Sequence, residues 1–276
     1  MNRQDIWKDN RRIKRGIEWT SIHDRPGWTA NPVRGCKHEC RWRMPDGSIS
    51  KCYAEEIANG IAASAYPGGF QNLTFDSREI MAISKLKEPA GIFIDSMSDL
   101  LGASVPPEWV EKTIACMTNN PQHVFFLLTK QPGNLAKFKF PKNVLVGVSA
   151  PPTFMFGKEL THTQQYVWLN RALMQLAECD CSWRWVSLEP LSFDVSEIIR
   201  AHRGKIDWAV IGAATQGPKR FQPSEAHLSA AVAALADRPI FFKGNLSYTM
   251  ALRVVGSWRE EFPAIGMNIN KQESLF

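Results

Sequence analysis

The sequence lacks any apolar run close to the ~20 residues that a membrane-spanning helix requires. Residues 1–16 contain no continuous apolar stretch of the kind found in secretory signals. Internal repeats, low-complexity tracts and a Gly-rich dinucleotide fingerprint are also missing from the 276 residues. These absences argue against membrane, secreted, repeat and dinucleotide-binding proteins. We expect a cytoplasmic protein with one large α/β domain or two small domains.

Cysteine is scarce, yet three of the six cysteines, Cys36, Cys40 and Cys52, gather in one polar segment. In a reducing compartment, such a group is more typical of metal ligands or catalysts than of disulfides. Three thiolates can hold a [4Fe–4S] cluster and leave one iron open to a substrate or cofactor. A zinc site that includes His38 is the alternative, and the close Cys-x3-Cys spacing favours the cluster. We expect packing roles for the other three cysteines, Cys116, Cys179 and Cys181.

Positive charge exceeds negative charge, because 33 Lys and Arg stand against 27 Asp and Glu, a formal net charge of +6. Basic side chains crowd residues 11–15 and flank the cysteines, where Arg34, Arg41 and Arg43 lie near the aromatic Trp42. A basic surface with aromatic side chains suits nucleic-acid binding, and a solvated tail is the alternative explanation for residues 11–15.

From residue 91 onward, short apolar segments alternate with amphipathic ones, a pattern typical of a parallel sheet covered by helices on both faces. Six or seven such units favour a full or partial (β/α) barrel over an open doubly wound sheet. We predict strands at 91–95, 123–129, 143–149, 183–188, 207–212 and 239–243, and helices at 53–65, 106–118, 163–178, 195–202 and 223–236.

In such a barrel the functional residues follow the carboxyl ends of the strands. The predicted strand ends carry polar or ionisable side chains: Asp95, Ser96, Ser98, Asp99, Thr129, Lys130, Ser149, Ser187, Glu189, Thr215, Gln216 and Lys243. An ionisable group directly after a buried strand needs a partner or a ligand. This requirement singles out Asp95, Lys130, Glu189 and Lys243.

An ordered set of motifs extends from about residue 17 to residue 243. The motifs are WTANPVRGC (28–36), CYAE (52–55), DSMSDL (95–100), LTK (128–130), VGVS (146–149), SLEP (187–190), DWAVIG (207–212) and FFK (241–243). In this order they resemble the phage-type three-cysteine branch of the radical SAM superfamily.

The resemblance implies an α/β fold, a partial (β/α)6-type barrel at residues 17–245, in a single domain. A basic N-terminal extension (1–16) and a C-terminal extension (246–276) would flank the barrel. The implied cofactors are a [4Fe–4S] cluster and S-adenosyl-L-methionine (SAM). Reductive cleavage of SAM would yield a 5′-deoxyadenosyl radical that abstracts hydrogen from the substrate, with an electron donor such as flavodoxin as a partner.

Carried over residue by residue, the resemblance makes Cys36, Cys40 and Cys52 the cluster ligands and puts Tyr53 beside the adenine. The segment from Asp95 to Ser98 stands where the superfamily contacts the methionine amino group. The other expected cofactor contacts are Ser96, Asp99, Thr129 and Ser149. The expected catalytic residues are Lys130 and Glu189. The expected substrate contacts are Arg34, Arg41, Trp42, Arg43, Gln216 and Lys243.

Two features depart from the branch. An insert, RWRMPDGSISK (41–51), precedes the last cysteine, and a hairpin with Pro45, Asp46 and Gly47 at its turn would keep the ligands close. The strand that usually ends in Gly-Gly-Glu-Ser-Gly ends here in GAATQG (212–217), so an acidic substrate contact is altered.

The resemblance and the basic charge lead to the hypothesis of an enzyme that modifies or rearranges a base in phage-type DNA (thymidine) hypermodification. Isomerisation of an amino-acid-decorated base is one form of this reaction, and a phage-encoded enzyme would work in the host cytoplasm. Aromatic side chains that would suit an extruded base are Trp28, Trp42, Phe70, Phe154 and Phe156. The alternatives are a DNA photoproduct lyase-like repair enzyme, an RNA-modifying radical SAM enzyme and a zinc-stabilised nucleic-acid-binding protein.

Overall fold

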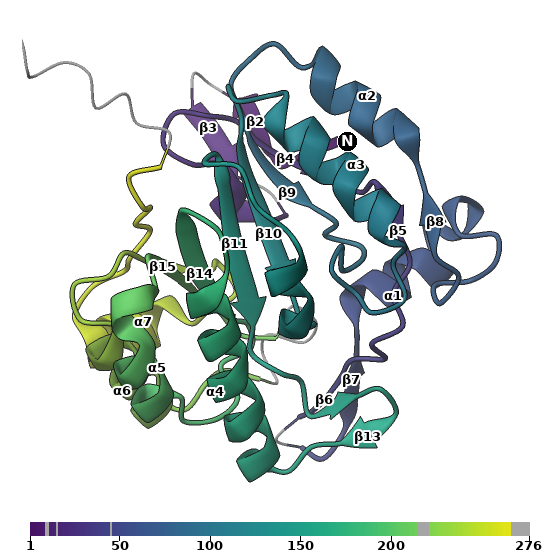
Figure 1. Cartoon of the computed structure of the whole chain (residues 1–276). Helices are drawn as coiled ribbons and strands as arrows, with labels where there is room; N and C mark the ends of the chain where they lie inside the picture. The colour runs from purple at the N-terminus through teal and green to yellow at the C-terminus, as the bar shows by residue number, and fades with distance from the viewer. Residues whose placement is uncertain (9–10, 15, 45, 215–220, 266–276) are drawn as a thin grey trace, which may run out of the picture.

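The computed structural model describes residues 1–8, 11–14, 16–44, 46–214 and 221–265 as a mixed α/β protein (Figure 1). Within these residues the main sheet has eight strands in the order β1-β4-β9-β10-β11-β14-β15-β16. The first strand runs antiparallel to its neighbour, and all later neighbours are parallel. The strands are β1 (Asn2–Arg3), β4 (Gly27–Ala30), β9 (Gly91–Ile94), β10 (Val124–Thr129), β11 (Val144–Ser149), β14 (Trp183–Leu188), β15 (Trp208–Ile211) and β16 (Ile240–Phe242).

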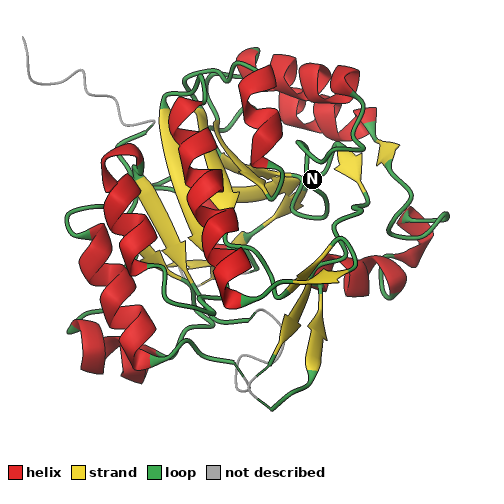
Figure 2. Cartoon of the chain, turned by 60° about the horizontal axis from the view of Figure 1, so that its bottom comes forward, coloured by secondary structure: helices red, strands yellow, loops and turns green. Residues whose placement is uncertain are grey.

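The main sheet curls into a half-barrel whose edge strands, β1 and β16, are not paired with each other in the described part of the chain. The seven parallel strands follow one another in chain order across the sheet. Parallel neighbours require crossover connections, which pack on the sheet as helices. Figure 2 shows these helices along the outside of the curl. The predicted α/β class with a parallel, barrel-like sheet is therefore confirmed.

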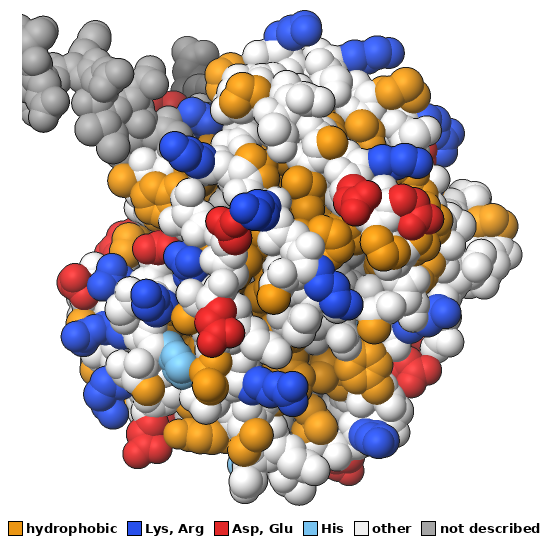
Figure 3. All heavy atoms as spheres, in the orientation of Figure 1, with side chains coloured by type: hydrophobic (Ala, Val, Ile, Leu, Met, Phe, Trp, Pro, Cys, Tyr) orange, Lys and Arg blue, Asp and Glu red, His pale blue; other side chains and the backbone are white. Residues whose placement is uncertain are grey.

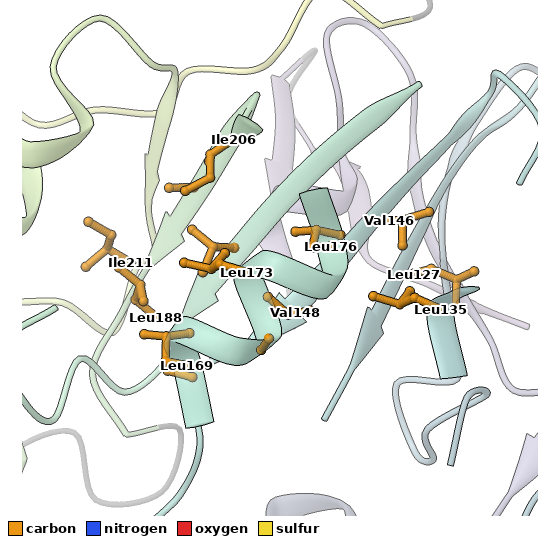
Figure 4. Packing of buried hydrophobic residues seen from close by; sticks show 14 of the residues in the cluster. Leu127, Leu135, Val146, Val148, Leu169, Leu173, Leu176, Leu188, Ile206 and Ile211 are labelled. Atoms are coloured by element: carbon orange, nitrogen blue, oxygen red, sulfur yellow. The ribbon is translucent and has the colours of Figure 1, made fainter. Parts of the chain in front are cut away.

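The outer face of the sheet is covered by α2 (Ser77–Lys85), α3 (Pro107–Thr118), α4 (His162–Glu178), α5 (Ser196–His202), α6 (Glu225–Leu235) and α7 (Tyr248–Val255). The helix α4 begins with a capping box, in which Thr161 and Gln164 satisfy each other's backbone N–H groups. Its buried leucines, Leu169, Leu173 and Leu176, recur at helical spacing and face the sheet (Figure 4). This apolar stripe fixes which side of α4 is buried.

A second core fills the inside of the curl. Strand side chains alternate between the two faces of a sheet, so every second residue points inward. The inward residues include Phe93, Phe126, Trp185, Trp208 and Phe241, which pack with Trp19 from the 3-10 helix η1 (Glu18–Thr20). The ring centroid of Trp19 lies 4.8 Å from that of Phe93 and 5.0 Å from that of Trp185. The polar residues that follow the strands lie beyond the carboxyl ends of the strands that carry this aromatic cluster.

Some connections differ from the predicted elements. The expected helix at 53–65 is shorter, because α1 (Tyr53–Asn59) ends at Gly60 and is followed by the 3-10 turn η2 (Ala63–Ala65). The connection from β10 to β11 is the 3-10 helix η3 (Pro132–Lys137). The sequence patterns predicted neither α2 nor α7.

Smaller sheets complete the described part of the chain: β2-β3, β5-β8 and the four-stranded sheet β13-β12-β6-β7. Their strands are β2 (Asp5–Lys8), β3 (Arg11–Lys14), β5 (Val33–Arg34), β6 (Arg41–Arg43), β7 (Ile49–Lys51), β8 (Thr74–Phe75), β12 (Phe154–Met155) and β13 (Lys158–Glu159). The 3-10 turn η4 (Arg203–Lys205) follows α5. Across the described ranges, no helix has the length and apolar character needed to cross a membrane.

Candidate functional site

The three clustered cysteines line one pocket. Cys36, Cys40 and Cys52 share it with His38, Glu39, Glu55, Phe70 and Gln71, around an empty volume of about 260 Å³ that is partly open to solvent. Cys40 is buried, and the other two thiols are half-buried. The pocket lies at the carboxyl end of the parallel strands, since a bridge joins the residue before Cys36 to the loop after β9.

Gly35 fixes the start of the cysteine loop. Its φ of +89° lies in the left-handed region, and its carbonyl oxygen accepts a 2.6 Å hydrogen bond from Ser98 Oγ. The backbone N–H of Cys36 donates to the carbonyl oxygen of Phe70 at 2.9 Å. A Cβ at Gly35 would lie 2.7 Å from the carbonyl oxygens of Phe70 and Asn72. The first cysteine therefore depends on a close backbone approach that only glycine permits.

The insert before the last cysteine forms the predicted hairpin. β6 and β7 pair antiparallel, with Arg41 opposite Lys51. The residue before β6 is Cys40 and the residue after β7 is Cys52, so the hairpin holds these two cysteines at its base. At its tip, Gly47 N–H donates to the carbonyl oxygen of Met44 at 2.9 Å. Pro45, which was also predicted at the turn, lies outside the described residues.

A second hairpin, β12 and β13, joins this insert. It follows β11, and Phe154 of β12 pairs with Arg41 of β6. The backbone N–H of Phe156 donates to the carbonyl oxygen of His38 at 2.7 Å. Figure 1 shows β6, β7 and β13 together at the end of the molecule toward which the β11 arrow points. The loop after β11, the fourth parallel strand, thus supports the cysteine loop. Sequence analysis did not predict this support.

The pocket favours the protonated forms of Cys36 and Cys40 when no metal is bound. Burial raises the pKa of Cys36, with a further increase from the negative charge of Asp99. Burial also raises the pKa of Cys40 to about 12, and the positive charge of Lys130 opposes this shift. Metal binding would therefore have to displace protons from the thiols.

No three His, Cys, Asp or Glu side chains in the described ranges are arranged around a single metal ion. In an iron–sulfur cluster, each thiolate binds a different iron, so the ligands surround the group and need not meet at one point. Three thiols that line one pocket are a donor set that fits such a cluster.

Asp99 connects the cysteine loop to two strand ends. Its buried carboxylate accepts hydrogen bonds from the backbone N–H of Leu101 at 3.0 Å and of Lys130 at 2.8 Å. The Thr129 hydroxyl donates to the same carboxylate at 3.1 Å, and His38 Nδ1 lies 3.6 Å from it. Asp99 and Thr129, predicted as cofactor contacts, are thus bonded to each other and to the backbone.

Asp95 is held in an unusual conformation after β9. Its φ is +59°, and its Oδ1 accepts a hydrogen bond from the backbone N–H of Val33 at 3.0 Å. Its Oδ2 is buried and has no hydrogen-bond partner within the described residues. Burial raises the pKa of Asp95 well above the usual aspartate value. A residue with a left-handed backbone and a buried carboxyl oxygen that has no partner is the kind of strained group found at binding sites.

Tyr53, at the start of α1, reaches the same loop. Its hydroxyl donates to the carbonyl oxygen of Ser96. Burial raises the pKa of Tyr53, and among the further causes is the negative charge of Glu189. The structure therefore brings the segment after Cys52, the loop after β9 and the end of β14 close together.

An ion pair faces this group from the far strands. Lys243 Nζ lies 2.8 Å from Glu189 Oε2, and the two side chains are only 13% and 12% exposed. Ser187 Oγ donates to the other oxygen of Glu189 at 3.4 Å. Ser149, at the end of β11, is buried and donates to the carbonyl oxygen of Ala150 at 3.2 Å. The predicted residues at these strand ends thus lie on the inside of the curl.

The three arginines near the cysteines, Arg34, Arg41 and Arg43, have acidic partners. Arg34 pairs with Asp76 at 2.6 Å, and Arg43 pairs with Glu159 at 2.6 Å. Arg41 binds Glu55 of α1 at 2.6 Å and donates to the carbonyl oxygen of Cys40 at 2.8 Å. Sequence analysis did not predict these acidic partners. Asp76 and Glu159 are far in sequence from the arginines that they bind, and only Glu55 is close to its partner, Arg41.

Of the predicted aromatic contacts, Phe156 is 43% exposed, and Trp42 and Phe154 are half-buried. Phe70 is buried beside α1, and the partly buried Trp28 packs against the outer core. Gln216 lies outside the described residues. On the face shown in Figure 3, basic and acidic side chains are interspersed rather than gathered by sign.

The fold and the pocket define a parallel α/β half-barrel with three cysteines at the carboxyl end of its strands. A family model described as "Protein of unknown function (DUF5131)" matches residues 14–253, and the chain belongs to that family. No match was found among curated proteins.

The chain is also similar to solved structures of spore photoproduct lyase. A mutant with bound AdoMet and dinucleoside spore photoproduct has 11% identity and a TM-score of 0.43, over 67% of this chain and 55% of that chain. A complex with dinucleoside spore photoproduct has 10% identity and a TM-score of 0.42, over 75% and 60%. A third, mutant structure has 12% identity and a TM-score of 0.39, over 80% and 65%. The chain thus spans less than two thirds of the length of each.

Proposed function

We propose that the chain is a radical SAM enzyme, with Cys36, Cys40 and Cys52 as ligands of a [4Fe–4S] cluster. The observation that carries this proposal is that the three cysteines line one pocket although an insert separates the last two in sequence. In this proposal β4, β9, β10, β11, β14 and β15 are the strands of a (β/α)6-type barrel at residues 17–245, and β16 adds a seventh strand.

When bound, the cluster and SAM would supply the radical chemistry, in which one electron cleaves SAM to methionine and a 5′-deoxyadenosyl radical. An electron donor such as flavodoxin would provide that electron. The protein binds and orients the cofactors and the substrate, and it excludes water from them. Cys40 is buried, and the buried aromatic side chains of the cluster around Trp19 keep the neighbouring interior of the curl apolar. The positive charge of Lys130 favours the thiolate form of Cys40.

The residues around Tyr53 would receive SAM. The Tyr53 hydroxyl fixes Ser96, and the amide of Asn31 holds the same loop by accepting hydrogen bonds from Ser96 Oγ at 3.2 Å and Met97 N–H at 2.9 Å. The free oxygen of Asp95 would accept a hydrogen bond from the amino group of SAM. Ser98, through its bond to Gly35, couples this loop to the first cysteine.

Anaerobic reconstitution with iron and sulfide tests the proposal. The wild-type protein should become brown, bind about four irons per chain and release 5′-deoxyadenosine from SAM when reduced with dithionite. Cys52→Ala should lose both the colour and the product. Cys116→Ala is the matched control, because this buried thiol lies on α3, outside the pocket, and both signals should remain. A protein that binds zinc and no cluster would instead support the nucleic-acid-binding alternative.

For the substrate we propose a base in DNA, with the modification of thymidine in phage-type hypermodification as the lead and isomerisation of an amino-acid-decorated base as one form. The net charge of +6 supports a polyanionic partner. The hairpin β6–β7, which lies between Cys40 and Cys52, supports it further, because Arg43 is 47% exposed and Trp42 is half-buried. The polar ion pair of Glu189 and Lys243 would contact the base or its attached group after extrusion.

Nucleoside mass spectrometry of DNA incubated with active enzyme and SAM tests this substrate. A new or rearranged thymidine product, absent with Cys52→Ala, is the expected result. Reversion of a photoproduct to thymines would favour a repair lyase, and products found only in RNA would favour the RNA-modifying alternative. Binding to duplex DNA should also weaken steeply with salt, whereas a flat salt response would argue against contacts with the phosphates.

A further inference from the structure

His38 stands inside the cysteine loop and is not one of the three thiol ligands. Its side chain is 5% exposed and lines the same pocket as Cys36, Cys40 and Cys52. Its Nε2 is buried and has no hydrogen-bond partner within the described residues. A buried ring nitrogen without a partner costs free energy unless it binds something, so the atom points to a ligand that fills the pocket.

The other ring nitrogen of His38 lies near a carboxylate. His38 Nδ1 lies 3.6 Å from Asp99 Oδ2, and Asp99 cannot easily turn away, because backbone N–H groups of Leu101 and Lys130 hold it. The negative charge of the nearby carboxylate favours the tautomer with the proton on Nδ1, which leaves the lone pair on Nε2. Metal-bound histidines commonly have this carboxylate–histidine arrangement, which fixes the tautomer and the ring orientation.

The backbone and ring of His38 are also fixed from the opposite side. Its carbonyl oxygen accepts a 2.7 Å hydrogen bond from the N–H of Phe156. The two rings meet edge to face, with centroids 5.0 Å apart and an interplanar angle of 75°. The imidazole is therefore held between Asp99 in the loop after β9 and the hairpin β12–β13, with little freedom to rotate out of the pocket.

We propose that His38 is a fourth protein ligand of the metal group, binding through Nε2 to the iron that the three thiolates leave without a protein ligand when SAM is absent. Imidazole is an accepted iron ligand and replaces cysteine in some iron–sulfur centres. This inference rests on the proposed function, and it adds a nitrogen donor that the three-cysteine motif does not contain. SAM would then compete with His38 for the same iron.

Pulsed EPR of the reduced, cluster-loaded protein without SAM tests the proposal directly. Protein labelled with 15N-histidine should show the coupling of a directly bound histidine nitrogen, which adding SAM should remove. His38→Ala should lose that coupling. His202→Ala is the matched control, because this histidine on α5 pairs with Asn170 away from the pocket, and the coupling should persist.

A second variant separates ligation from folding. His38→Cys offers a thiolate in place of the imidazole, so it should keep the full iron content and still lose the nitrogen coupling. A wild-type protein with a complete cluster and no histidine coupling would overturn this inference alone. A coupling that survives in His38→Ala or His38→Cys would do the same. Failure of the wild-type protein to hold a four-iron cluster would overturn the proposed function as well.

Discussion

The close approach at Gly35 predicts that its substitution by alanine damages the cysteine pocket. An alanine there would keep the left-handed φ of +89°, which costs about 1–2 kcal/mol for a residue with a Cβ. Its Cβ would also lie 2.7 Å from the carbonyl oxygens of Phe70 and Asn72. These are backbone atoms that cannot rotate away, and such overpacking costs a further ~1–3 kcal/mol.

Gly47→Ala is the matched control for this substitution. Gly47 has a φ of +81°, and nothing lies within 4 Å of a Cβ built on it. The Gly47→Ala variant should therefore lose only the stability that the left-handed backbone conformation costs an alanine, about 1–2 kcal/mol. The expected difference between the two variants is about 2 kcal/mol, which corresponds to about 4–8 °C in Tm for a chain of this size.

Differential scanning calorimetry of the metal-free proteins measures this difference, and the iron content after reconstitution reports on the pocket. Gly35→Ala should hold less than half of the wild-type iron, since the clash displaces Cys36. Gly47→Ala should hold the wild-type amount, since its backbone turn lies at the far tip of the hairpin. Equal melting temperatures and equal iron contents would refute the role assigned to the carbonyl oxygens around Gly35.

Three further predictions concern charged groups. Hydrogen bonds from Arg78 hold the pKa of Asp76 at about 2, so its stabilisation is complete above pH 4 and is lost as the pH falls through about 2. Between pH 5 and pH 3, the free energy of unfolding measured with urea should therefore fall by up to about 1 kcal/mol more for the wild type than for Asp76→Asn, and equal pH dependences would contradict this. Lys243→Met leaves the Glu189 carboxylate almost buried and without its ion-pair partner, so the free energy of unfolding measured with urea should fall by about 3–5 kcal/mol. Adding Glu189→Gln in a double variant should restore part of this stability. Arg43→Ala removes a pair that is about half exposed, so stability should change by less than about 1 kcal/mol, and a weaker affinity for duplex DNA in a filter-binding assay would then reflect a lost phosphate contact.

The parallel sheet could be predicted because each of its strands is buried on both faces. The segment 143–149 is almost entirely apolar, and the structure has it as β11 (Val144–Ser149). The helix predicted at 163–178 matches α4 (His162–Glu178) within one residue, because its buried leucines repeat at helical spacing. Burial on both faces leaves a continuous apolar run in the sequence, and that signal is local.

The missed elements have signals that are weak or not local. The helix α2 is short and mostly polar, and its clearest sign is the N-cap Asp76, which accepts from the N–H of Arg78. The pairing of β6 with β12 joins Arg41 to Phe154, which no local pattern can reveal. The same is true of Arg43 and Glu159, whose attraction depends on that sheet. Sequence reasoning found the cysteines and the polar strand ends, and it could not find the contacts that hold them together.

The hairpin between Cys40 and Cys52 connects the cysteine pocket directly to the molecular surface. Its base carries two thiols, and its strands extend away from the pocket into a sheet shared with β12 and β13. A macromolecule that grips the hairpin and shifts it would also shift the two sulfur atoms. Linkage then requires the reverse effect, so loading the pocket must change the affinity of the hairpin for that macromolecule by the same factor. Under the proposed function, substrate binding at the hairpin and loading of the cysteine pocket would therefore influence each other.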